Sequence, residues 1–219
     1  MSEKARELLQ DCSAVLFDFD GIIIDSEWPI YETWKQVFAD EGHVLEASTY
    51  VQCIGSDFDT WSPEKYLESL TGKSYDWNII NDRRQVILEA DLEDAETLPG
   101  VRELIAKLKA DGKKIAVVSS SSHRWVDMWL EKLDLVKEMH EVVCKGDAPN
   151  IKPAPDLYLE AVNRLGLKSS QCLVMEDSLN GILSAKAAKC PAIAIPSRLT
   201  SCLDFNIADA EINSFKLLL

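Results

Sequence analysis

Residues 13–25 read Ser-Ala-Val-Leu-Phe-Asp-Phe-Asp-Gly-Ile-Ile-Ile-Asp. A short apolar run ends here in two carboxylates, Asp18 and Asp20, and a glycine follows at once. Such a run is typical of a buried parallel strand, whose carboxyl end opens into the crevice where α/β sheets bind ligands. Two carboxylates placed there are costly unless a positive group, such as a divalent cation, neutralises them. The stretch therefore predicts a metal-dependent site at the end of a first strand.

The last 120 or so residues alternate between helical and strand patterns. Alternation of this kind indicates a doubly wound parallel sheet with right-handed crossovers. We therefore predict the α/β fold class. The expected helices cover 101–110, 123–133, 155–165 and 179–188, and the expected strands cover 114–119, 140–144, 172–176 and 191–195.

An insertion separates the first strand from this alternating region. Helical patterning covers 28–41, 61–71 and 77–93, with no convincing strand between 28 and 97. The segment is also acidic, because residues 25–97 hold 17 Asp and Glu but only 5 Lys and Arg. We predict a core domain of residues 1–25 and 96–219, with an all-helical domain of residues 26–95 inserted into it.

The bulk composition excludes several classes of protein. A net charge of −14 at pH 7 gives no basic footprint for nucleic-acid phosphates. No apolar stretch approaches the ~20 residues that a membrane span requires, and the charged N-terminus is not a signal peptide. Six scattered cysteines favour reduced thiols over disulfides or a zinc site. We expect a cytoplasmic monomer with no membrane or nucleic-acid partner.

Further polar residues follow the later strands. Four serines, residues 119–122, offer hydroxyls and backbone amides to an anion. Lys152 stands just outside a helix start, where its ammonium can reach a phosphate. Glu176 and Asp177 add oxygen ligands for a hard cation. Each pattern alone more often marks a polar loop or a helix cap, but the ordered set favours phosphoryl transfer.

At these positions the chain resembles the haloacid dehalogenase-like (HAD) hydrolases. It is most similar to the helical-cap subfamily that includes β-phosphoglucomutase and related sugar-phosphate phosphatases. The resemblance covers nearly the whole chain and implies a Rossmann-like core with a helical cap that closes over the substrate. Ile151 departs from the glycine usual before the motif lysine, although the lysine itself is present. The matching motifs are Asp18-Phe19-Asp20-Gly21, Ser119, Lys152-Pro153-Ala154-Pro155-Asp156 and Glu176-Asp177-Ser178.

The resemblance implies a role for each motif residue. Asp18 would be the nucleophile that forms an aspartyl-phosphate, while Asp20 would protonate the leaving oxygen and later activate water. Mg²⁺ would be held by the side chains of Asp18 and Asp177 and the backbone carbonyl of Asp20, with Glu176 assisting. The groups expected to bind the phosphoryl oxygens are Ser119, Ser120 and Lys152.

A phosphatase and a phosphomutase share these motifs, so the cap must distinguish them. A mutase that acts on a bisphosphate must bind a second phosphate group. The likely cap loop, residues 53–59, offers two acids and no base, and Ile30 stands where the mutase carries a histidine. Serines also replace the lysine that the mutase carries after motif two. The residues expected to contact the rest of the substrate are Trp28, Ser121, Ser122 and His123.

We therefore predict hydrolysis of a small phosphate monoester with a neutral remainder, such as a sugar or polyol phosphate. Three alternatives stay open. One is a phosphomutase of the β-phosphoglucomutase type, since His123 and Arg124 could supply distal positive charge. Another is a dehalogenase, whose chemistry does not need the metal carboxylates. The last is a non-catalytic binding module on the same fold.

Overall fold

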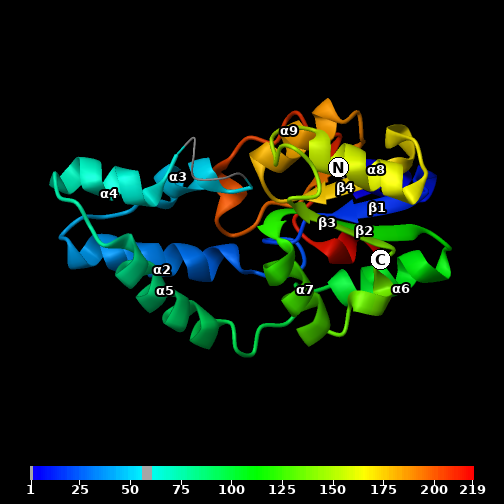
Figure 1. Cartoon of the computed structure of the whole chain (residues 1–219). Helices are drawn as coiled ribbons and strands as arrows, with labels where there is room; N and C mark the ends of the chain where they lie inside the picture. The colour runs from blue at the N-terminus through cyan, green and yellow to red at the C-terminus, as the bar shows by residue number, and fades with distance from the viewer. Residues whose placement is uncertain (1, 56–60) are drawn as a thin grey trace.

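The computed structural model describes residues 2–55 and 61–219. Its centre is a six-stranded sheet with the order β3-β2-β1-β4-β5-β6, in which every neighbouring pair is parallel (Figure 1). The first predicted strand is β1, and it lies in the middle of the sheet, between β2 and β4. The strands run over Ala14–Phe17 (β1), Lys114–Ser122 (β2), Glu141–Lys145 (β3), Cys172–Glu176 (β4), Ala192–Ala194 (β5) and Ala210–Glu211 (β6).

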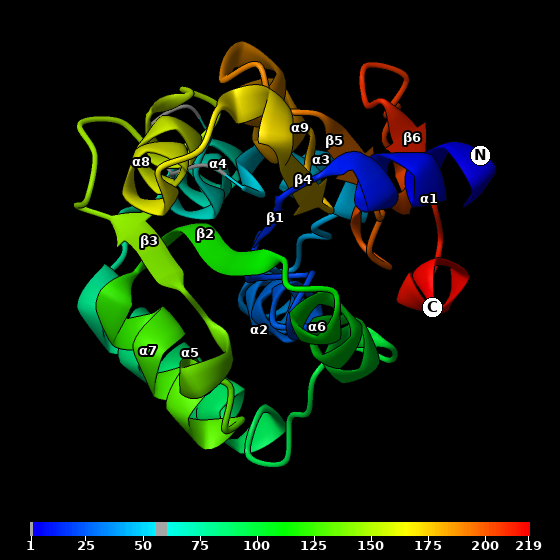
Figure 2. The same cartoon turned by 90° about the vertical axis from the view of Figure 1, so that its right-hand side faces the viewer.

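Helices bury both faces of this sheet. Figure 2 shows α6 and α7 on one side and α8 and α9 on the other. Side chains alternate along β1: Val15 and Phe17 join the apolar cluster of α6 and α7, whereas Ala14 and Leu16 join that of α8 and α9. This two-sided burial confirms the predicted doubly wound α/β core. The core helices are α1 (Ser2–Asp11), α6 (Val101–Ala110), α7 (His123–Lys132), α8 (Asp156–Leu165) and α9 (Leu179–Ala187).

Between β1 and α6, the described residues form four more helices, which make up the cap. They project to one side of the sheet (Figure 1), and the described residues from 27 to 98 contain no strand. Their own apolar cluster includes Trp34, Phe38 and Leu67. The chain leaves and re-enters the core at one point, where the Leu98 N–H donates to the Ile23 carbonyl at 2.8 Å. These helices are α2 (Glu27–Asp40), α3 (Ala47–Tyr50), α4 (Pro63–Thr71) and α5 (Trp77–Asp91).

The inserted helical cap is therefore confirmed, while its limits at residues 26 and 95 stay a prediction. Neither α1 nor β6 was predicted from the sequence. In α1, Ala5 and Leu9 lie one turn apart and are buried among charged neighbours, and β6 spans only two residues. Strand β2 also extends past the expected end at residue 119, because Ser122 still pairs with Lys145 of β3 after an irregularity.

Two findings bear on the excluded classes. Within the described ranges, no helix combines the length and apolarity required to span a bilayer. All six cysteines are free thiols. The predicted absence of a disulfide framework therefore holds, and the cytoplasmic location stays a prediction.

Candidate active site

Neighbouring strands bring the motif residues to one edge of the sheet. Phe17 at the end of β1 lies opposite Val117 of β2 and Met175 of β4, so the residues that follow these three come together. A pocket of about 130 Å³ lies at this edge, between core and cap. Its lining from the core is Asp18, Asp20, Ser119, Ser120, Ser121 and Asp177, and its lining from the cap is Glu27, Ile30, Tyr50, Cys53 and Gly55.

Lys152 lies beneath Asp18 and does not line the pocket. Its buried ammonium contacts Asp18 Oδ1 at 2.5 Å, Glu176 Oε1 at 2.7 Å and the Val118 carbonyl at 2.7 Å. These contacts use all three of its N–H donors. Desolvation lowers the pKa of Lys152, but the two carboxylates outweigh it and raise that pKa above its usual value. The charged lysine thus holds the Asp18 carboxylate in place.

Glu176 is saturated by protein donors. Oε1 accepts from Lys152 Nζ and from Tyr158 OH at 2.8 Å, and Oε2 accepts from the N–H and Oγ of Ser178 at 3.2 and 3.0 Å. A carboxylate has about four acceptor positions, and all four are occupied here. Gly181 makes this packing possible, because a Cβ there would overlap the Glu176 carboxylate. Glu176 therefore contributes charge and orients Lys152, with no lone pair to spare for a metal.

Asp177, in contrast to Glu176, accepts no hydrogen bond from the described residues. It is fully buried, and neither of its carboxylate oxygens has a hydrogen-bond partner within residues 2–55 and 61–219. Desolvation, reinforced by the charges of Asp18 and Glu176, raises its pKa well above the usual range. A buried carboxylate without a partner is costly, which indicates a site built for a cation.

The surrounding donors fit a divalent metal. Carboxylate oxygens of Asp18, Glu176 and Asp177 lie within 4.8 Å of one another. Gly21 adjoins Asp177 so closely that any Cβ would overlap its carboxylate, so the loop after β1 can approach only as glycine. Burial and the Glu176 charge raise the pKa of Asp18 to about 8 in spite of Lys152. The oxygens of Asp18 and Asp177, with the charge of Glu176 behind them, form the oxygen-only donor set that Mg²⁺ prefers.

The serine loop joins the core side of the pocket to the cap. Ser119 Oγ is buried and accepts the Ser121 N–H at 3.0 Å. Ser120 Oγ donates to the Gly55 carbonyl at 3.2 Å, so the cap loop rests on it. Asp57 and Asp59, whose charges entered the prediction against a mutase, lie outside the described residues.

Comparison with known proteins agrees with this geometry. A family model described as "Haloacid dehalogenase-like hydrolase" matches residues 15–195. The chain belongs to this family. A Bacillus subtilis (strain 168) protein named "Putative phosphatase YhcW" is 33% identical to this HAD hydrolase over 201 residues, which cover 92% of the chain and 91% of the relative. Hexitol phosphatase B of Escherichia coli (strain K12) is 28% identical over 212 residues, which cover 92% of the chain and 91% of that relative.

A solved structure shows the same architecture. β-Phosphoglucomutase from Clostridium difficile matches with a TM-score of 0.75 over 95% of this chain and 93% of that one, at 19% identity. At this identity the likeness shows the fold alone. Together with the family match, the relatives confirm the predicted class of enzyme, a phosphatase of the HAD hydrolases.

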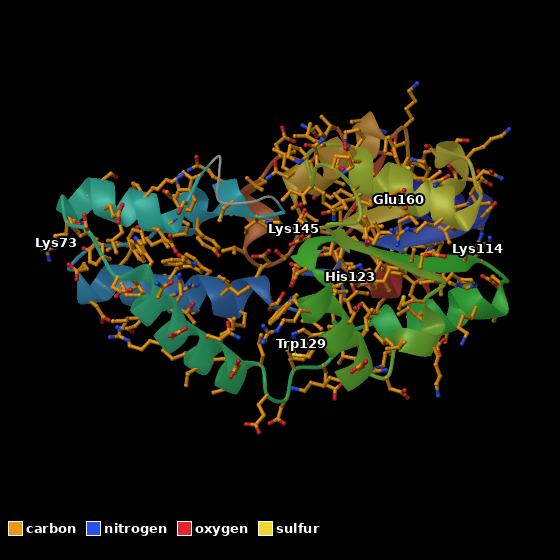
Figure 3. All side chains as sticks on the ribbon, in the orientation of Figure 1. Lys73, Lys114, His123, Trp129, Lys145 and Glu160 are labelled. Atoms are coloured by element: carbon orange, nitrogen blue, oxygen red, sulfur yellow. The ribbon has the colours of Figure 1, made fainter. Side chains whose placement is uncertain are left out.

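Three of the four predicted specificity residues do not line the pocket of this HAD hydrolase, whereas the fourth, Ser121, lines it. The Arg198 guanidinium stacks over the Trp28 ring, with Cζ of Arg198 3.4 Å from the ring centroid. Ser122 lines a separate groove beside α5. His123, at the start of α7 in Figure 3, contacts Asp147 at 2.7 Å. Trp28 and His123 thus each have a charged partner elsewhere, because aromatic rings and imidazoles interact with whichever charge folding brings near.

Several residues of the site were not predicted from the sequence. Glu27, in the first turn of α2, faces the pocket from the cap, and Ser26 just before it donates to Asp20 at 2.5 Å. Ser26 and Glu27 stand where the chain passes from the core into the cap, and this position in the sequence could have predicted a place near the site. Tyr50 and Cys53 gave none, because their place in the lining depends on how the cap packs.

Loss of the Asp177 charge is expected to remove the response to metal. In the wild type, Mg²⁺ at about 100 times its Kd should raise the melting temperature by about 5–10 °C. Asp177→Asn should show no such rise, and its metal-free melting temperature should be no lower than that of the wild type, because a buried unpartnered acid is removed. Thermal denaturation with Mg²⁺ or chelator measures both, with exposed Asp25→Asn as the control. A full Mg²⁺ response in Asp177→Asn would contradict the site.

Proposed function

We propose that the chain is a Mg²⁺-dependent phosphatase that hydrolyses a small sugar or polyol phosphate through a phosphorylated Asp18. One observation carries the proposal. A nucleophile anchored by Lys152 faces a pocket, and the buried carboxylate of Asp177 stands beside it with both oxygens unpartnered in the described part of the chain. This arrangement supports phosphoryl transfer, in which a metal and fixed charges stabilise the transferred group.

The residues divide the reaction into two steps. Lys152 holds Asp18 Oδ1, so Oδ2 is the oxygen free to attack phosphorus. Asp20 gives a proton to the leaving oxygen, which departs as an alcohol. It then takes a proton from the water that attacks phosphorus, and the bond from phosphorus to Asp18 breaks to release phosphate. The hydroxyl of Ser119 and the amides of the serine loop bind the phosphoryl oxygens.

The side chains of Asp18 and Asp177 and the backbone carbonyl of Asp20 are the groups that would hold Mg²⁺. When bound, the ion supplies positive charge for the phosphoryl oxygens and for the crowded carboxylates. Glu176 assists from behind by keeping Lys152 in place, since its own acceptor positions are filled.

The cap side of the pocket supports a neutral, hydroxylated remainder of the substrate. No lysine or arginine lines the pocket among the described residues, and the cap instead contributes the carboxyl of Glu27. Within the described chain, Glu27 has no hydrogen-bond partner, so its oxygens can accept from substrate hydroxyls. A second phosphate would meet no cation here, which disfavours the mutase alternative. Hexitol phosphatase B, by its name, acts on polyol phosphates.

A panel of monoesters tests the function. We expect hydrolysis of hexose and hexitol phosphates with Mg²⁺ and none with chelator. Isomerisation of glucose 1-phosphate, primed with a bisphosphate, should be slower than its hydrolysis. Faster isomerisation would favour the mutase, and failure to hydrolyse any ester of the panel would favour a binding module.

Glu27→Gln is expected to change substrate preference. Burial, together with the charges of Asp20 and Asp18, raises the pKa of Glu27 well above its usual value, so its negative charge is present only above that raised pKa. The amide keeps the size of the side chain and removes that charge. At a pH above the raised pKa of Glu27, the ratio of kcat/KM for 2-phosphoglycolate to that for sorbitol 6-phosphate should rise by about tenfold or more, because repulsion of the distal carboxylate is relieved. Below that pKa the ratio should change less, because Glu27 is already neutral. Glu32→Gln, on the same helix and outside the lining, is the control. An unchanged ratio would contradict a substrate-facing Glu27.

A further inference from the structure

The carboxylate of Asp20 is held by three side chains from three separate places in the chain. Ser26 Oγ, at the base of the cap, donates to Oδ1 at 2.5 Å. Trp125 Nε1, in the first turn of α7, donates to the same oxygen at 2.9 Å. Ser121 Oγ donates to Oδ2 at 2.7 Å. Two donors on one oxygen and one on the other fix the rotation of the carboxyl group.

This fixation matters for proton transfer. When the ester breaks, the P–O bond to the leaving oxygen cleaves, and its electron pair stays on that oxygen. The oxygen takes the proton of Asp20 and departs as a neutral alcohol, while Asp20 becomes a carboxylate and phosphorus bonds to Asp18. Because Oδ1 already accepts two hydrogen bonds, the proton belongs on Oδ2. An acid must stay within hydrogen-bond reach of the leaving oxygen, so its orientation affects the rate directly.

Trp125 is the member of this set that belongs to a core helix. Ser26 is the N-cap residue of the cap helix α2, whereas Trp125 lies on the core helix α7. Its ring is half-buried, packs edge-on against Trp129 with centroids 5.8 Å apart, and lines the groove of about 550 Å³ between α7 and the cap helix α5.

Trp129 offers an internal comparison on the same helix. It lines the same groove and lies on α7 beside α5 (Figure 3), but its buried Nε1 has no hydrogen-bond partner in the described chain. Removing the indole N–H of Trp125 therefore breaks a hydrogen bond to Asp20. Removing that of Trp129 breaks no hydrogen bond within the described chain. The two tryptophans line the same groove, but only Trp125 donates to Asp20.

We infer that Trp125 is a positioning residue, which orients the Asp20 carboxyl so that its proton faces the leaving oxygen. The inference rests on the proposed function, because it assigns Asp20 the role of acid. It adds a residue outside the strand-end motifs, and it predicts that the importance of Trp125 depends on how much the leaving group needs a proton.

The test compares Trp125→Phe with Trp129→Phe on two substrates in the presence of Mg²⁺. Sorbitol 6-phosphate has an alkoxide leaving group that must be protonated, whereas p-nitrophenyl phosphate releases a stable phenolate. The ratio kcat/KM reports the steps up to formation of phosphorylated Asp18. For Trp125→Phe, kcat/KM should fall about 10- to 100-fold on sorbitol 6-phosphate, mainly through kcat, and less than about threefold on p-nitrophenyl phosphate. Trp129→Phe should leave both values within about threefold of wild type.

Other outcomes would overturn the inference. Equal losses on the two esters would make Trp125 a structural residue, and unchanged activity would make its hydrogen bond to Asp20 irrelevant. Melting temperatures of the two variants separate unfolding from a catalytic effect. Ser121→Ala gives a second measurement, because loss of the donor on Oδ2 should show the same leaving-group dependence. Wild-type protein that hydrolyses neither ester would instead refute the proposed function, so the two failures are distinguishable.

Discussion

Asp18→Asn is expected to abolish hydrolysis and to leave the protein folded. An amide cannot attack phosphorus, so the first covalent step is lost, and kcat should fall by about 10⁴-fold or more. The fold should tolerate the change because asparagine has the same shape and because Lys152 keeps its contact with Glu176 at 2.7 Å. The metal-free protein also loses one of three carboxylates crowded within 4.8 Å.

Steady-state assays with sorbitol 6-phosphate and thermal denaturation measure the two effects. Asp25→Asn is the matched control, because Asp25 is exposed and lies outside the pocket lining. Activity of Asp18→Asn near the wild-type level would refute the assignment of the nucleophile. Lost activity together with a collapsed melting curve would show that Asp18 is required for folding, which would contradict a purely chemical role for its carboxylate.

Lys152→Met is expected to have the largest effect on stability. The methionine fills the volume of the lysine stem but leaves two buried carboxylates, Asp18 and Glu176, without their cation. Removing one partner of a buried ion pair typically costs about 3–5 kcal/mol, which corresponds here to a fall in melting temperature of roughly 10 °C. Activity should be lost as well, since Asp18 loses the contact that orients it.

The control is Lys186→Met, which breaks a part-exposed pair with Asp209 and should cost no more than about 1 kcal/mol. A second variant tests the cause. Adding Glu176→Gln to Lys152→Met should restore part of the lost stability, because it removes one of the two stranded charges. If Lys152→Met melts like the wild type, the buried ion pairs do not contribute as the geometry indicates.

Topology explains why much of the site was predictable. Parallel strands of a doubly wound sheet present their carboxyl ends at one edge, so Asp18, Ser119 and Asp177 had to meet once their strands were recognised. Their residue types then indicated metal and phosphate chemistry. Both conclusions follow from local pattern and from strand order, without any knowledge of side-chain packing.

The remaining features depend on contacts between distant elements. Glu176 looks like a metal ligand in sequence, but Tyr158 of α8 and Lys152 fill its Oε1, and neither neighbour is evident from the motif itself. Trp28 lies close to the hinge in sequence, yet it packs under Arg198. Trp125 reads as an apolar helix residue, and only the packing of α7 brings its N–H to Asp20.

The central claim is that hydrolysis passes through a phosphoryl group on Asp18. Its most direct test is rapid acid quenching of the wild-type enzyme during turnover of sorbitol 6-phosphate, followed by peptide mass spectrometry. We expect the peptide that contains Asp18 to gain the mass of one phosphoryl group at that residue when Mg²⁺ is present. The gain should be absent with chelator and in Asp18→Asn. Turnover that releases inorganic phosphate while Asp18 stays unmodified, or a phosphoryl group on another residue, would contradict this mechanism.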